Sequence, residues 1–182
     1  DNMNSIKPSD TLWMYAPFNS KKYYFRFDPR PNNNLKAFSV LATDNDTIWC
    51  GTAGGINKST DGGISWQKFT HQNQDYPILG DWVISIKEQR LQNKTRIWAT
   101  NWQADQPTEK NGVSYTEDGG QTWINLLLGV KSYDFAFKDS IAYIATEEGL
   151  YRTDDGGLSF NRSNLITDPA TRQVITSNSI FS

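Results

Sequence analysis

The chain has 182 residues, with 18 basic and 20 acidic side chains, a net charge of -2 at pH 7 and a single cysteine. This length suits one domain, and one cysteine excludes an internal disulfide. The near-neutral charge, without a basic cluster, argues against nucleic acid as a partner. No apolar run is long enough to cross a membrane, so we expect no membrane insertion.

The first part of the chain contains pieces of a strand pattern but no complete unit. Residues 10–16 carry a tryptophan in the same apolar context as later segments, and residues 23–27 are mostly aromatic. Residues 28–34 contain two prolines and three consecutive asparagines, which is typical of a loop. We therefore predict an incomplete unit over residues 10–30.

Three longer segments then repeat one order of elements. In each, an alternating apolar run is followed by a second apolar segment, a glycine, a third segment, a polar turn and a short fourth segment. Alternating short runs separated by turns predict four short strands per unit. The units span residues 36–70, 80–127 and 130–163, and the second is longer because of an insertion at 102–111.

The polar turn has nearly the same sequence in all three units, at intervals of 57 and 37 residues. Its glycines reach positive φ without steric cost, and its aspartate accepts hydrogen bonds from backbone N–H groups two residues on. A hydroxyl residue precedes the aspartate, and an aromatic residue closes the turn and excludes water from it. The members of these turn motifs are Ser59, Asp61, Gly63 and Trp66; Thr116, Asp118, Gly120 and Trp123; and Thr153, Asp155, Gly157 and Phe160.

The pattern Ser/Thr-x-Asp-x-Gly-x-Ser/Thr-Trp resembles the Asp-box, or BNR repeat, of β-propellers such as sialidases, sortilin-type receptors and xyloglucan-cleaving glycosidases. The resemblance implies an all-β propeller of four-stranded antiparallel blades, with each motif between the third and fourth strands and remote from the ligand face. It also implies a secreted, periplasmic or cell-surface protein.

The last segment, 172–182, looks like a first strand with no second strand after it. Two arrangements follow. This strand could join the incomplete unit at 10–30 and close a ring of four blades, or the chain could be part of a larger propeller. We favour the second arrangement, a part of a larger propeller, because propellers have four to eight blades and four is the lower limit. An open propeller would also be expected to self-associate through its uncovered blade face.

The tryptophans lead to a candidate ligand surface. Five of the seven are explained by the repeat: Trp13, Trp49 and Trp98 occupy equivalent second-strand positions, and Trp66 and Trp123 close turn motifs.

The other two, Trp82 and Trp102, lie next to loops that meet at one end of the blades. Asp81 precedes the first strand of the second unit, and Asp105 lies in the insertion. Because loops often carry function, we predict that Trp102, Asp81, Trp82 and Asp105 form a surface for a protein or glycan ligand.

The sequence favours a non-enzymatic scaffold or binding module that needs no cofactor. The alternative is part of a glycoside hydrolase, xyloglucanase-like or sialidase-like, with catalytic carboxylates partly outside this chain. Asp81, Asp105 and Glu109 are its candidates, since such enzymes use two facing carboxylates. The arginines lack the context of a sialidase triad. The only histidine, His71, is predicted to be a solvated loop residue, and no cluster has metal-ligand spacing, so we expect no metal.

Overall fold

A computed structural model describes residues 33–163, 166–167 and 169–175 of the chain. The incomplete unit predicted at 10–30, and most of its proposed partner strand at 172–182, lie outside the described residues. Within the described part, β14 (Val174–Ile175) pairs antiparallel with β13 (Ile166–Thr167) to form a small two-stranded sheet. No helix among the described residues is long and apolar enough to cross a membrane.

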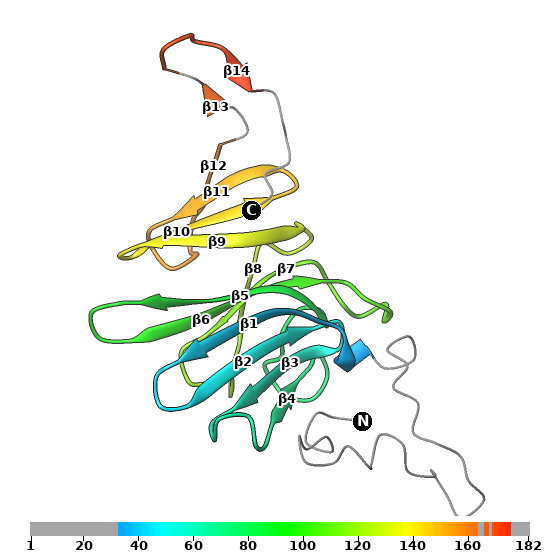
Figure 1. Ribbon diagram of the computed structural model, residues 1–182. Coiled ribbons are helices and arrows are strands. Elements are labelled where there is room, and N and C mark those ends of the chain that lie inside the picture. Colours follow the sequence, from blue (N-terminus) through cyan, green and yellow to red (C-terminus); the bar gives the residue numbers. More distant parts are fainter. Residues whose placement is uncertain (1–32, 164–165, 168, 176–182) are drawn as a thin grey trace, which may run out of the picture.

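Three four-stranded antiparallel sheets make up the body of the protein (Figure 1). In each sheet the strands follow chain order: β1-β2-β3-β4, β5-β6-β7-β8 and β9-β10-β11-β12. This confirms the predicted all-β fold, and the stacking of the three sheets is that of consecutive propeller blades. A 3-10 turn, η2 (Asn33–Leu35), precedes the first sheet. The strand bounds are β1 Ala37–Thr43, β2 Thr47–Thr52, β3 Gly55–Ser59, β4 Gln67–Phe69, β5 Trp82–Arg90, β6 Thr95–Trp102, β7 Gly112–Thr116, β8 Ile124–Leu126, β9 Ser132–Lys138, β10 Ile141–Thr146, β11 Gly149–Thr153 and β12 Asn161–Ser163.

The first turn motif is a closed hydrogen-bond network around Asp61. The Ser59 hydroxyl donates to Asp61 Oδ1 at 2.7 Å and accepts the Gly63 N–H at 2.8 Å. The Ser65 N–H donates to Asp61 Oδ1 at 2.9 Å, and the Ser65 hydroxyl donates to Oδ2 at 2.6 Å. The Trp66 indole N–H closes the turn on Gly63 O at 3.0 Å. The aspartate thus captures an N–H four residues on, rather than two as the sequence predicted.

The other two motifs repeat the hydrogen bonds around the aspartate, but not the indole bond of Trp66. Thr122 donates its N–H and its hydroxyl to Asp118, and Ser159 does the same to Asp155, each hydroxyl bond being 2.6 Å long. The predicted two-residue bond occurs only at Asp155, which also accepts the Gly157 N–H at 3.2 Å. The longer reach follows from the glycine pair, whose positive φ values curl the chain back over the carboxylate.

These networks stabilise the ionised carboxylates. The Ser65 hydroxyl, with backbone N–H groups, lowers the pKa of Asp61 to about 2. Burial alone would raise the pKa of Asp118, but the hydrogen bonds from Thr122 outweigh it and lower the pKa to about 2. The Ser159 hydroxyl likewise lowers the pKa of Asp155 well below its ordinary range. All three turns are therefore built around a charged aspartate.

The hydrophobic core lies between the sheets rather than within one. One cluster joins the first and second sheets, where Trp49 and Phe69 pack against Trp123 with ring centroids 6.2 and 6.0 Å away. The second cluster joins the second and third sheets around Trp98, which is fully buried and lies 5.8 Å from Phe135. The two second-strand tryptophans within the described residues are thus packing residues, as predicted, and Cys50 in β2 is also buried.

The turn motif of one sheet also packs against the preceding sheet. The Lys58 ammonium on β3 donates to Gly119 O at 2.8 Å, and a Cβ on Gly120 would lie 2.6 Å from the Phe69 ring. In the same way, a Cβ on Gly157 would lie 2.4 Å from the Leu126 side chain. The motifs therefore stabilise the contacts between blades as well as their own hairpins.

Candidate functional site

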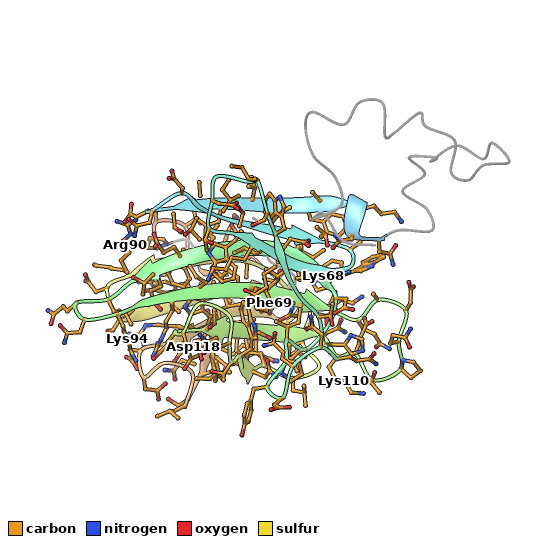
Figure 2. The ribbon with its side chains drawn as sticks, turned by 90° about the horizontal axis from the view of Figure 1, so that it is seen from below. Lys68, Phe69, Arg90, Lys94, Lys110 and Asp118 are labelled. Carbon is orange, nitrogen blue, oxygen red and sulfur yellow. The ribbon has the colours of Figure 1, made fainter. Side chains whose placement is uncertain are left out.

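Loops from the first two sheets meet at one end of the blades. They are the connection from β4 to β5, the insertion between β6 and β7, and the turn between β2 and β3. Backbone hydrogen bonds join them: the Lys110 N–H donates to Leu79 O at 2.8 Å, and the Gly55 N–H donates to Asp81 O at 2.7 Å. Figure 2 shows Lys110 toward this end and Arg90 and Lys94 at the opposite end.

An open polar hollow of about 330 Å³ lies among these loops. Three carboxylates contribute to it, from Asp81, Asp105 and Glu109, together with the ammonium group of Lys68. Burial lowers the pKa of Lys68, and the charge of Asp81 partly offsets that effect. The complete lining is Asn33, Asn34, Ala53, Gly54, Lys68, Asp81, Ala104, Asp105, Gln106 and Glu109.

Buried amide side chains hold one wall of this hollow in place. Asn57, on β3, donates to Asn34 Oδ1 at 2.9 Å, and the Thr52 hydroxyl donates to the same oxygen at 3.3 Å. Asn34, Asn57 and Thr52 are all buried. Because buried polar groups that are fully paired are rigid, this network fixes the end of η2 against the first sheet.

The insertion is organised around Glu109, a residue that is only 1% exposed. Its carboxylate accepts a very short hydrogen bond from the Ala104 N–H and a 3.3 Å bond from the Gln106 N–H. Asp105 lies nearby on the surface and accepts a 2.9 Å bond from the Asn33 side chain. The insertion is therefore tied both to itself and to the segment before β1.

His71 is not the solvated loop residue that the sequence predicted. Its side chain is only 6% exposed, and its Nδ1 lies 3.0 Å from Asp81 Oδ2 and 3.7 Å from Glu109 Oε1. The His71 backbone N–H donates to Asp81 Oδ1 at 2.9 Å, and Nε2 lies 3.1 Å from the Thr108 hydroxyl. The prediction was wrong because the insertion folds over the β4–β5 connection, a contact between segments 37 residues apart.

The predicted surface is only partly brought together as a ligand site. Asp81 and Asp105 line the hollow, but the two tryptophans contact neighbouring sheets instead. The Trp102 indole N–H donates to Ser132 O at 2.7 Å, and its ring meets Tyr133 edge-on at 5.4 Å. The Trp82 ring lies 6.1 Å from Phe38 on β1. Neither tryptophan is among the residues that line the hollow.

A second open hollow, of about 360 Å³, adjoins the first at the same end. His71 lines this one, while Asp81 and Glu109 line the other. Thr108 and Lys110 from the insertion face it as well. The side chains of His71, Asp81 and Glu109 therefore form part of the wall between the two hollows.

Sequence reasoning missed Lys68, Asn34 and His71 as members of this end. Lys68 lies in a strand only three residues long, and Asn34 lies in a run of asparagines that indicated only a loop. For His71 the sequence offers only a spacing of ten residues before Asp81, and that spacing alone does not predict contact.

Comparison with solved structures shows β-propellers. The extracellular domain of a protein described as a hybrid two component system, BT3049 from B. thetaiotaomicron, superposes with a TM-score of 0.60 and 15% identity, over 83% of this chain and 20% of that one. An ancestral GH74 enzyme gives 0.55 and 20% identity, over 75% and 19%. The extracellular domain of a protein described as a one component system, BT4673 from the same organism, gives 0.54 and 14%, over 74% and 18%.

This chain thus spans about a fifth of the length of these solved chains. At such identities the similarity concerns the fold, which is a partial propeller. No protein-family model and no curated protein matches the chain.

Proposed function

We propose that the chain is a non-enzymatic binding module from a secreted or cell-surface Asp-box propeller, which recognises glycan or protein through the loops at one end of its blades. The observation that carries this proposal is the polar hollow. Carboxylate, amide and ammonium groups from two blades converge there on a rigid support.

The arrangement of the turn motifs supports this assignment. The three motifs share one hydrogen-bond network, and each follows the third strand of its sheet, at the end of the blade opposite the hollow. This is the placement that the Asp-box resemblance implies. Two structural neighbours are extracellular domains, which fits a location outside the cytoplasm.

Glycoside hydrolysis is the second candidate, because Asp81, Asp105 and Glu109 line one hollow and a GH74 enzyme shares the fold. Binding is favoured over hydrolysis for two reasons. Glu109 is buried and its carboxylate already accepts two backbone N–H bonds, so it is not accessible to the glycosidic bond of a substrate. Among the described residues, the lining of the hollow contains no aromatic side chain, although sugar-cleaving clefts commonly use them.

The test compares loop variants with a control at the opposite end of the blades. Lys68→Ala and Asp105→Ala remove side chains from the hollow, whereas Asp44→Ala removes an exposed carboxylate from the β1–β2 turn. Binding is screened on a glycan array and then measured by affinity electrophoresis in soluble polysaccharide. We expect the two loop variants to lose retardation and Asp44→Ala to keep it.

Hydrolysis is measured in the same samples as the release of reducing ends from xyloglucan. We expect none. Release that Asp81→Asn abolishes would establish the hydrolase instead. Equal retardation of the wild type and all three alanine variants would show that this end of the blades is not the ligand surface.

A further inference from the structure

His71, Asp81 and Glu109 each offer one ligand atom, and these atoms lie within 4.8 Å of one another. They come from the β4–β5 connection and from the insertion, so only folding brings them together. We propose that this trio binds a first-row transition dication such as Zn²⁺. This inference does not depend on which ligand the loops recognise.

The separations suit a shared metal ion. Two ligands each about 2.1 Å from a tetrahedral Zn²⁺ lie about 3.4 Å apart. The distances from His71 Nδ1 to Asp81 Oδ2 and to Glu109 Oε1, 3.0 and 3.7 Å, lie on either side of this value. The longest separation in the trio is at most 4.8 Å. Side-chain rotation that moves one carboxylate oxygen by up to about 1.4 Å therefore completes the geometry.

The buried, unpaired ring nitrogen of His71 is the second observation that points to a cation. His71 Nδ1 is buried and has no hydrogen-bond partner, even though Asp81 Oδ2 is at ion-pair distance, because that oxygen is out of line for an N–H···O bond. On the other side of the ring, Nε2 can donate to the Thr108 hydroxyl at 3.1 Å. Proton placement on Nε2 leaves the Nδ1 lone pair facing two carboxylates.

The three side chains are at most 17% exposed, and lone pairs of acceptors that face one another repel unless a cation or a proton lies between them. A metal-binding histidine commonly donates its other ring N–H to an outer partner, which here is Thr108. One imidazole nitrogen with two carboxylate oxygens is a donor set that suits Zn²⁺ and its first-row neighbours better than the all-oxygen sites of Mg²⁺ or Ca²⁺.

The surrounding charge also favours a dication. The carboxylate of Asp105 lies in the same hollow, and the single ammonium group there is that of Lys68. Lys110 lines the adjoining hollow, so the three carboxylates face two lysine side chains, and the net charge around the trio remains negative. The trio borders both hollows, so an ion has a route from solvent, and positions not filled by protein remain open to water or to a bound ligand.

The experiment uses the full 182-residue chain, stripped of metal by dialysis against EDTA. Zn²⁺ binding is measured by isothermal titration calorimetry, and Co²⁺ is added to a second sample to record its visible d–d absorption. We expect one equivalent of Zn²⁺ and a Co²⁺ spectrum of low coordination number. His71→Ala and Asp81→Asn should weaken Zn²⁺ binding at least about 100-fold, which exceeds most outer-shell effects.

Asp105→Asn is the matched control, because it removes a carboxylate from the same hollow but outside the trio. It should change Zn²⁺ affinity by less than about 5-fold, as expected for a solvent-exposed charge. Circular dichroism in EDTA checks that each variant folds, and Asp81→Asn keeps the Oδ1 that accepts the His71 N–H.

Three results would overturn the proposal. They are absence of stoichiometric Zn²⁺ binding to the folded wild type, equal affinity of the wild type and His71→Ala, and an equal loss in Asp105→Asn and Asp81→Asn. The first would mean that a proton on His71, not a metal, neutralises the trio. Because polysaccharide retardation is measured without added metal, failure here leaves the binding-module proposal separately testable.

Discussion

Replacing Trp123 by alanine should destabilise the protein far more than the same change at Trp66, although both residues close the same motif. Trp123 is only 3% exposed and packs between the first two sheets, against Trp49 and Phe69. Trp66 is half-buried and covers its own turn, where its indole N–H donates to Gly63 O at 3.0 Å. The repeat makes them equivalent, but the packing does not.

The expected magnitudes follow from these contacts. Truncating a buried tryptophan to alanine costs about 3–5 kcal/mol, because the transfer free energy is lost and a cavity remains. For Trp66 we expect about 1–2 kcal/mol, from one hydrogen bond and partial burial. At about 2–4 °C per kcal/mol for a domain of this size, Trp123→Ala should lower Tm by about 6–20 °C.

The assay is urea unfolding followed by far-ultraviolet circular dichroism, which does not depend on the tryptophans removed. Trp123→Phe is the control for aromatic packing. The Trp123 indole N–H is buried without a hydrogen-bond partner, so phenylalanine loses no bond and should cost only about 1–2 kcal/mol. Equal losses of unfolding free energy in Trp66→Ala and Trp123→Ala would refute the conclusion that Trp123 of the second motif stabilises the packing of two blades.

Three further predictions concern the turn motifs and the insertion. Folding lowers the pKa of Asp118 from 3.8 to about 2, so the stability that its carboxylate contributes is present above about pH 4 and is lost as pH falls toward 2. In a plot of the urea midpoint against pH, Asp118→Asn should therefore reduce the fall between about pH 4 and 2. Trp102→Ala should cost about 2–3 kcal/mol in urea unfolding, since it removes contacts between sheets; an unchanged urea midpoint would make Trp102 a surface residue. Gly120→Ala should cost about 2–4 kcal/mol of unfolding free energy, because its φ is 97° and its new Cβ would lie 2.6 Å from the Phe69 ring. Gly62→Ala, with φ 69° and open space around the new Cβ, should cost only about 1 kcal/mol. Equal losses would contradict the close approach of Gly120 to Phe69.

Part of the candidate site could be predicted from the sequence. The sequence predicted that Asp81 and Asp105 would share one end of the blades, because alternating strands place every second connection at the same end. It did not predict that Trp102 would pack against Tyr133, nor that His71 would be buried beside Glu109. Side-chain direction and loop folding depend on contacts between residues far apart in the chain, and no local pattern encodes them.

The sequence by itself determined the four-stranded sheets and their turns, because both depend on short-range physics. Alternation sets which residues face the core, and the glycine pair and aspartate of each motif form hydrogen bonds within a few residues. Only the tertiary structure decided which motif residue is a wedge between blades and which side chains meet at the hollow. Those outcomes depend on how one sheet stacks on the next. A single insertion folds over a neighbouring connection and places a lone histidine beside two carboxylates.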